Sequence, residues 1–436
     1  TTASNNTAIG RGALTANTTG ASNIAVGINA LVANTTASNN TAVGAAALAA
    51  NTTATGGVGI GYRALNVNTT GANNTAVGSD ALLANTTGHS NTALGQHAVK
   101  TATTATYNTG LGRLALGAAT TGSFNTAVGA LSGDAITTGA DNTFVGYQSG
   151  SGTTTGADNT AIGQDALLAN TTGGNNVAVG SLALDANTTG GENTAVGYQS
   201  LSSATTVDNN TAFGYTALRD NTSGTSNLAV GVNTLRLNTT ASNNTGVGAF
   251  ALDVNTTGAS NTALGSAALG ANTTGAENTA IGSQAGDALT TGFSNTALGV
   301  KALSSDTTGR YSVAIGHSAL ENQAFTGNNN SYNTAVGYSA GNDVTTGVQN
   351  TLIGGLAGDA LTDADFNIAI GYAALGADTL GSNSTAIGWS ALAAQNFTSA
   401  TLSYNTAVGF KAGLSVTTGT ENTLIGGLAG DALTDA

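Results

Sequence analysis

The sequence predicts an all-β protein built as a parallel β-solenoid of about 25 coils, each 17 residues long. A glycine that closes segments such as NTAVG recurs every 17 residues, the residues before it alternate with period 2, and proline is absent from the 436 residues. A fixed period of this kind is typical of a solenoid or array, in which each repeat forms one structural unit stacked on the next.

The repeat is counted from this glycine, called the repeat glycine, and other positions are numbered from it as −1, +1 and so on. It occurs nineteen times at 17-residue spacing from Gly10 to Gly316, and then at Gly337, Gly354, Gly371, Gly388, Gly409 and Gly426. Two units are four residues longer. We therefore expect one continuous solenoid over residues 1–436, with longer coils at 317–337 and 389–409. These two coils, with Phe325 and Phe397 in their insertions, are candidates for local protrusions.

A short β-strand is predicted just before each repeat glycine. Position −1 is apolar in all 25 units, position −2 is usually Ala, and position −3 is usually Thr, with Ile24, Val177, Leu228, Val313 and Ile368 among the replacements. Period-2 alternation over such residues favours a strand, with alternate side chains on one face. We expect positions −3 and −1, for example Thr75 and Val77, to face the core. A helix is disfavoured because glycine would interrupt it in every unit.

Positions +4 and +7 are predicted to share one core. Position +4 is usually Leu, and where it is Gly (Gly133, Gly286, Gly341, Gly358, Gly413, Gly430) an apolar residue stands three positions later (Ile136, Leu289, Val344, Leu361, Val416, Leu433). Close packing requires that the interior volume be kept, so one bulky group moves between two places. The exception is Gly150, which is followed by Thr153.

Two polar positions are predicted to form ladders along the solenoid. Position −4 is Asn in 22 of 25 units and position +8 is Thr in 23 of 25. Stacked about 4.8 Å apart, residues such as Asn74 and Thr86 would bond to their copies in neighbouring coils and to turn backbone.

All ten Tyr fall at positions +1 and −5, which flank the strand, so we expect them at the surface.

The composition excludes several classes of protein. Zero Cys rules out disulfides and thiolate metal sites, and the net charge of −13 with only 9 basic residues disfavours a nucleic-acid or anionic-membrane surface. No apolar run approaches the roughly 20 residues that span a bilayer. Because Met is absent, we expect a processed product or a fragment of a longer chain.

The segment YSVAIGHSAL, from Tyr311 to Leu320, contains SVAIG, and NTAVG-type segments occur in all units. This phrase resembles the head repeat of YadA-like trimeric autotransporter adhesins, and similar repeats occur in phage tail-fibre-like proteins. The resemblance implies a left-handed parallel β-roll, three chains packed about one axis, and adhesion at a bacterial surface.

Motifs that suggest chemistry have simpler interpretations. GYSAG around Ser339 matches the G-x-S-x-G nucleophile pattern, but it arises from the repeat when Ser precedes Ala. The three His (His89, His97, His317) fall at different repeat positions, and the Asp of the GDA segments (Asp134, Asp287, Asp359, Asp431) lacks the calcium-binding nonapeptide. NTT at Asn85 forms a glycosylation sequon. In a bacterial or viral product we interpret it as corner chemistry, whereas in a secreted eukaryotic or archaeal protein it is a candidate for glycosylation. We predict no enzyme, and no catalytic, cofactor-binding or metal-binding residues.

The function predicted is that of a structural extracellular fibre, shaft or filament subunit, serving surface adhesion or matrix formation. The expected partners are copies of the chain itself, as an end-to-end filament or a homotrimer, and a host surface or glycan; nucleic acid and a membrane span are not expected. The alternative is an ice- or glycan-binding solenoid module, although adjacent TT places its two Thr on opposite sides of a strand. The expected location is extracellular or at the cell surface.

Overall fold

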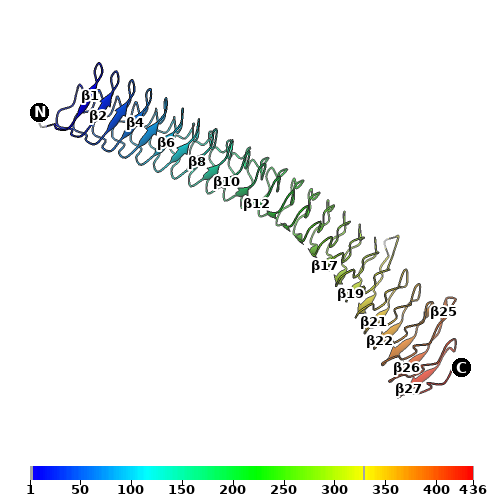
Figure 1. The fold of residues 1–436 in the computed structure, drawn as a ribbon. Helices are drawn as coiled ribbons and strands as arrows, with labels where there is room; N and C mark the ends of the chain where they lie inside the picture. The colour runs from blue at the N-terminus through cyan, green and yellow to red at the C-terminus, as the bar shows by residue number, and fades with distance from the viewer. Residues whose placement is uncertain (1–2, 328, 436) are drawn as a thin grey trace. The chain divides into compact units, whose positions relative to one another are not determined.

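The computed structural model describes residues 3–327 and 329–435, and this part of the chain is all-β with no helix. It contains 25 strands of three residues, one in each coil, and turns make up most of each coil (Figure 1). The prediction of a parallel β-solenoid with 17-residue spacing is confirmed. The chain divides into two compact units, Thr1–Tyr215 and Thr216–Ala436, each described here by itself.

Unit 1 has one strand in each coil. These strands are β1 (Thr7–Ile9), β2 (Ile24–Val26), β3 (Thr41–Val43), β4 (Val58–Ile60), β5 (Thr75–Val77), β6 (Thr92–Leu94), β7 (Thr109–Leu111), β8 (Thr126–Val128), β9 (Thr143–Val145), β10 (Thr160–Ile162), β11 (Val177–Val179), β12 (Thr194–Val196) and β13 (Thr211–Phe213).

Unit 2 has the same design, with two additional strands of two residues, β23 and β25. Its strands are β14 (Leu228–Val230), β15 (Thr245–Val247), β16 (Thr262–Leu264), β17 (Thr279–Ile281), β18 (Thr296–Leu298), β19 (Val313–Ile315), β20 (Thr334–Val336), β21 (Thr351–Ile353), β22 (Ile368–Ile370), β23 (Gly381–Ser382), β24 (Thr385–Ile387), β25 (Thr401–Leu402), β26 (Thr406–Val408) and β27 (Thr423–Ile425).

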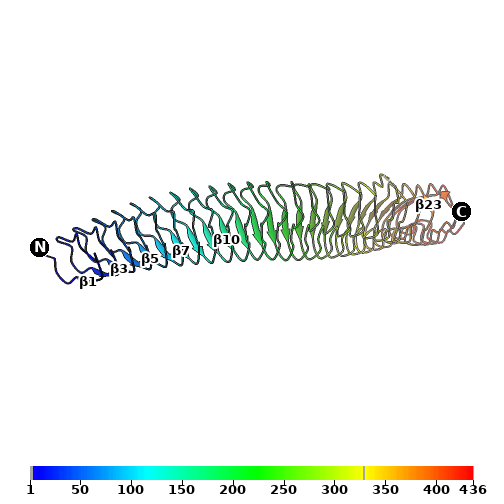
Figure 2. The same ribbon diagram turned by 90° about the horizontal axis from the view of Figure 1, so that it is seen from above.

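Strands of neighbouring coils are parallel and pair at the same repeat position, as Thr75 pairs with Thr92 and Ala76 with Ala93. Figure 2 shows the strands stacked side by side along the solenoid. The turns are joined in the same way, for example by the Leu82 N–H, which donates to the Ala98 carbonyl at 3.0 Å. Backbone N–H groups of both strands and turns donate hydrogen bonds to neighbouring coils. Proline has no N–H group, so few positions in a coil can accommodate it.

The inward and outward faces of each strand are the reverse of the sequence prediction. Ala76 at position −2 is fully buried, whereas Thr75 and Val77 on either side are only partly buried. The prediction that positions −3 and −1 face the core was therefore wrong. The physical reason is the narrow interior: Leu82 is fully buried in the same coil, so the opposing strand has space for a methyl group only.

Position +4 is the main apolar position of the interior, as predicted. Leu82 has φ 49° and Gly133, at the same position of another coil, has φ 57°, so the backbone there is left-handed with either residue. Glycine takes this conformation without strain, which explains why it is the alternative to Leu. Where Gly133 stands, Ile136 is fully buried, and the predicted exchange between positions +4 and +7 is confirmed.

The exception at Gly150 is resolved by Phe144, which replaces Ala at position −2 and is fully buried. A Cβ on Gly150 would lie 2.6 Å from the Phe144 ring, and one on Gly133 would lie 2.8 Å from it. The ring therefore fills the space left by two glycines, and Thr153 at position +7 needs no apolar side chain.

Both predicted ladders are present. Asn74 Oδ1 accepts from the Asn91 N–H at 2.9 Å, and its Nδ2 donates to the Gly88 carbonyl at 2.7 Å. Thr86 Oγ1 donates to the Thr103 carbonyl at 3.0 Å. These bonds link each coil to the next and satisfy backbone groups of the turns.

A third ladder, of buried Asn at position +7, was not predicted. Asn85 Nδ2 donates to Asn68 Oδ1 at 2.7 Å, so amide donors point to the preceding coil and acceptors to the following one. The ladder stops where the following coil has an apolar residue at this position. The last amide oxygen then has no hydrogen-bond partner: Asn85 is followed by Ala102, Asn187 by Ala204, and Asn272 by Leu289.

A shorter ladder with a different composition joins each longer coil to the coil before it. Asp306 and Gln323 occupy position +7 in consecutive coils, and Asp378 and Gln395 repeat the arrangement 72 residues later. Phe325 and Phe397, which lie in the insertions of the longer coils, are buried, 2% and 6% exposed, so these two side chains pack inside the solenoid.

Candidate functional site

The candidate site is the outward side of the strands, formed by the side chains at positions −3 and −1 and called the outer strand face. Position −1 carries an aliphatic or aromatic residue in every described coil, and many are well exposed: Leu94 and Leu264 are each 45% exposed. Other exposed members of this column are Ile9, Val43, Ile60, Leu111, Ile162, Phe213, Leu298, Ile353 and Ile425.

This exposure follows directly from the strand geometry. The side chains of a strand alternate, so the buried Ala at position −2 turns both of its neighbours outward. Since equivalent positions pair across coils, the position −1 side chains lie next to one another, as Val77 does with Leu94. Each unit thus presents an aliphatic column beside a column that is mostly Thr. Contiguous exposed apolar surface is a common feature of interaction sites, which makes this face the candidate site.

Aromatic side chains flank this face. All ten Tyr are exposed, which confirms the sequence prediction that they lie at the surface. Trp389 lies between Tyr372 and Phe410, with ring centroids 6.2 and 5.3 Å away and an interplanar angle of 15° in each pair. Lys411 Nζ lies 5.2 Å from the Trp389 centroid. Because each ring covers the face of the next, mainly ring edges remain for contact with a ligand.

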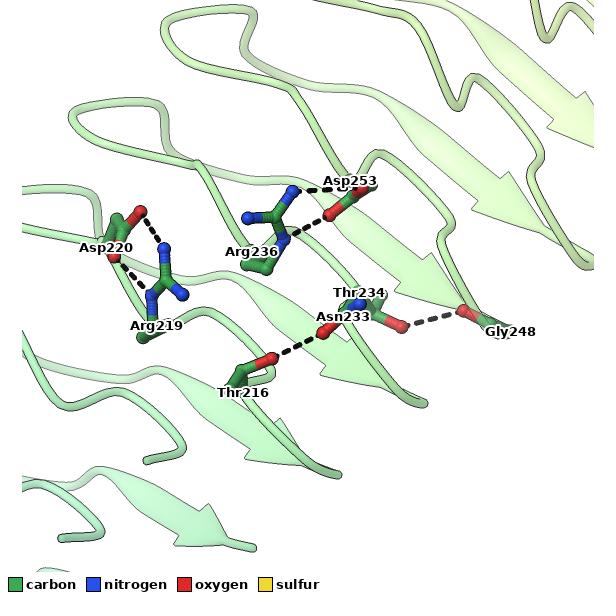
Figure 3. A network of polar contacts seen from close by, with 8 residues as sticks. All are labelled: Thr216, Arg219, Asp220, Asn233, Thr234, Arg236, Gly248 and Asp253. Atoms are coloured by element: carbon green, nitrogen blue, oxygen red, sulfur yellow. Dashed lines mark hydrogen bonds and ion pairs between the residues drawn. The ribbon is translucent and has the colours of Figure 1, made fainter. Parts of the chain in front are cut away.

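Three arginines near the strands, Arg63, Arg219 and Arg236, are paired with acids. Figure 3 shows that Arg236 and Asp253, from neighbouring coils, face each other, and Arg236 Nε donates to Asp253 Oδ1 at 2.8 Å. Arg219 Nε donates to the adjacent Asp220 at 2.6 Å. The hydrogen bond from Arg63 lowers the pKa of Asp80. These pairs neutralise guanidinium groups, so they do not form a basic surface of the kind that binds nucleic acid.

In the same network Thr216 donates to Asn233, and Thr234 Oγ1 donates to the Gly248 carbonyl at 2.7 Å (Figure 3). Thr234 replaces the usual Ala at position +3. A Cβ on Gly246 in the next coil would lie 2.7 Å from the Thr234 methyl group. Gly246 lacks the methyl group of the usual Ala, and this leaves space for the Thr234 side chain. The network therefore serves the packing of the coils.

The GYSAG segment is not a nucleophile elbow. Ser339 lies in a turn after β20 with φ 49°, and a strand follows this turn where the elbow requires a helix. His317, in the preceding coil, stacks on Tyr338 with centroids 5.7 Å apart and contacts Ser318. The structure brings together neither Ser339 with an imidazole-acid pair nor the three His with one another.

The Asp residues of the GDA segments are half-buried. Burial raises the pKa of Asp134, Asp287 and Asp359. Within the described residues, no group of three or more His, Cys, Asp or Glu is arranged to hold a metal ion. Desolvation of single carboxyl groups in a turn accounts for their environment.

The Asn of the NTT segments lies inside the solenoid. Asn85 is fully buried, and its Nδ2 donates both to Asn68 Oδ1 and to the Gly88 carbonyl, the latter at 2.9 Å. An amide held in this way cannot accept a sugar in the folded chain. The sequon at this position is a consequence of the ladder.

No protein-family model matches the chain, and no curated protein is significantly similar to it. Among the described residues there is no helix with the length and apolar character to cross a membrane.

Proposed function

We propose that this chain is a structural subunit of an extracellular fibre, shaft or filament, and that copies of it pack side by side through the outer strand face. The observation that carries the proposal is the exposed aliphatic column at position −1, which runs through the coils of each unit. A protein that functions as a monomer rarely leaves a contiguous apolar column in water.

The size of this face is suited to association. Thirteen strands spaced about 4.8 Å apart give a strip about 58 Å long in unit 1, and two columns of side chains are about 10 Å wide. Each unit thus offers about 600 Å², against the roughly 800 Å² that each partner buries in a typical specific interface. Specific interfaces at the lower end of the size range, about 1,200 Å² in total, bury about 600 Å² on each partner, so the face of one unit reaches this range.

A second copy of the chain is the partner that fits best. The column repeats once per coil, and only another stack of strands presents side chains at the same spacing of about 4.8 Å. The low charge of the chain, 7% Asp, Glu, Lys and Arg, keeps repulsion between copies small. The resemblance to trimeric adhesin repeats supports three chains about one axis, and adhesion at a cell surface as the biological use.

The test is the mass of the chain in solution, measured by sedimentation over a wide concentration range. The proposal predicts an oligomer that becomes monomeric when Val77, Leu94, Leu111 and Val128 are replaced by Thr. A control variant carries four Thr→Ser changes at position +9 (Thr36, Thr53, Thr70, Thr87), outside the strand face, and should keep the oligomer. A monomer at all concentrations of the unmodified chain would refute side-by-side packing.

The alternative of an ice-binding module has one specific observation in its favour. The Thr of position −3, such as Thr92 and Thr109, lie on the outer strand face in neighbouring strands, in a regular array. Their companions at position −1 vary among Val, Ile, Leu and Phe, which gives an uneven surface. Thermal hysteresis of the purified chain would favour this alternative. Glycan binding finds less support, because the stacked aromatic rings cover one another's faces.

A further inference from the structure

The outer strand face has one irregular feature. Position −3 is Thr in most coils but aliphatic in six, namely Ile24, Val58 and Val177 in unit 1 and Leu228, Val313 and Ile368 in unit 2. In all six coils the residue at position −2 is buried, so these side chains point outward; Ile24 is 42% and Ile368 39% exposed. Packing of the core therefore gives no reason for an aliphatic residue at these positions.

A strictly repetitive face would leave the register between copies undefined. If one copy slides by one coil, about 4.8 Å, nearly identical side chains meet again. Flat repetitive strands are weakly specified in register and slip for this reason. A fibre subunit that packs through such a face needs features that break the repeat.

The spacing of the six residues breaks the repeat efficiently. In unit 1, Ile24 and Val58 are two coils apart, and Val58 and Val177 are seven coils apart. In unit 2, Leu228 and Val313 are five coils apart, and Val313 and Ile368 are three coils apart. No separation occurs twice within a unit. Any shift other than zero therefore brings at most one aliphatic residue of a unit opposite another.

We propose that these six residues, called the register key, hold parallel copies of the chain in zero register. The inference rests on the proposed side-by-side association. In zero register the aliphatic residues of neighbouring copies meet and are buried together. In a shifted register at most one aliphatic residue of a unit meets another, and the others meet Thr, whose hydroxyl loses water without gaining a partner. The key acts on the choice of register, whereas the position −1 column drives association.

The absence of Cys from the sequence allows a direct test, because one introduced thiol is unique in each chain. Thr109→Cys and Thr126→Cys place thiols on the outer strand face in neighbouring coils, away from the key. An equal mixture of the two chains is oxidised, and the disulfides are identified by mass spectrometry. We expect 109–109 and 126–126 bonds to exceed 109–126 bonds at least tenfold.

Two variants then test the key itself. In the first, all six residues are replaced by Thr, the usual residue at this position; it should still associate, but 109–126 bonds should become as frequent as same-position bonds. In the second, which carries Thr126→Cys, the key is moved one coil onward, to Thr41, Thr75, Thr194, Thr245, Thr334 and Thr385. This variant is mixed with chains that carry Thr109→Cys or Thr126→Cys and the unmodified key. Its thiol should bond mainly to the thiol introduced at position 109 of those chains.

The outcomes separate this inference from the proposed function. A monomeric parent chain would overturn both. An oligomer whose six-Thr variant keeps same-position bonds would overturn the register key alone, because another feature, such as the longer coils, would then set the register.

Discussion

The carboxylate of Asp306 accepts a hydrogen bond from Gln323 Nε2 at 2.7 Å inside the solenoid, at position +7, where eleven coils carry Asn. The preceding coil has Leu289 at this position, which cannot accept a hydrogen bond. An ionised Asp has no donor group, so it does not require an acceptor in that coil. Gln323 Oε1 in turn accepts from Asn333 Nδ2 at 2.9 Å. Asp and Gln thus make a two-residue ladder that is satisfied at both ends, unlike the Asn ladders.

Replacing Asp306 by Asn should destabilise unit 2. The carboxylate accepts hydrogen bonds from Gln323 Nε2, from the Gly309 N–H at 3.0 Å and from the Phe325 N–H at 3.3 Å. The side-chain NH2 group of an Asn would face one of these donors, and that hydrogen bond would be lost. We expect a loss of about 1–3 kcal/mol in the free energy of unfolding, measured by guanidinium denaturation.

The matched control is Asp141→Asn. Asp141 is exposed at position −5 with φ 58°, and Asn73 occupies the same position with the same φ. This change should stay within about 0.5 kcal/mol. Equal losses in the two variants would show that the buried ladder does not distinguish Asp from Asn.

Alanine at a repeat glycine should be among the most damaging single changes. Gly78 has φ 134°, and a Cβ there would lie 2.6 Å from the Gly95 carbonyl oxygen of the next coil. Strain and backbone displacement together should cost Gly78→Ala about 3 kcal/mol. Gly427→Ala is the control, since a Cβ at Gly427 meets nothing within 4 Å. Thermal unfolding of both variants checks the difference; similar midpoints would contradict the close approach of coils.

The interior around Phe144 predicts a rescue. Phe144→Ala leaves a cavity between Gly133 and Gly150 and should cost about 3–5 kcal/mol. Adding Gly150→Leu, in the coil whose position +7 is Thr153, restores the Leu–Ala arrangement of other coils and should recover most of this loss. In the parent chain Gly150→Leu alone should destabilise, because Phe144 already fills the space. Denaturation of all four chains forms a thermodynamic cycle, and simple additivity would contradict shared volume.

The repeat made much of the fold predictable. Features that depend on residues recurring at one position could be predicted. These are the period, the strand position, the ladders that contain Asn74 and Thr86, and the exchange of a bulky residue between the positions of Gly133 and Ile136. The side of the strand that faces inward could not: alternation shows that Ala76 and Val77 lie on opposite faces, but the width of the interior decides which is buried. That width depends on where the turns place Leu82.

The candidate site was missed for the same reason. The Tyr columns were predicted to be exposed because Tyr flanks the strand, but the aliphatic column was assigned to the core, so the outer strand face had no place in the prediction. Its apolar character was visible in the sequence. The two long coils show a similar limit, since Phe325 sits in an insertion and is nevertheless buried.

Stability should depend on pH through the half-buried carboxyl groups. Burial raises the pKa of Asp134, Asp287 and Asp359, so the folded chain binds these protons more tightly than the unfolded chain. The resulting stabilisation is complete below the ordinary Asp pKa of about 3.9 and is lost as pH rises through the raised values. Asp80 acts in the opposite sense, because Arg63 lowers its pKa and its contribution is lost as pH falls through that lowered value.

The triple variant Asp134→Asn, Asp287→Asn, Asp359→Asn should therefore gain stability relative to the parent as pH rises from about 4 to 7. Asp80→Asn should show the reverse trend, losing stability relative to the parent at neutral pH and approaching it in acid. Guanidinium midpoints measured across this range check both trends. A constant difference between the triple variant and the parent at every pH would mean that the three carboxyl groups are as well solvated in the folded chain as in the unfolded one.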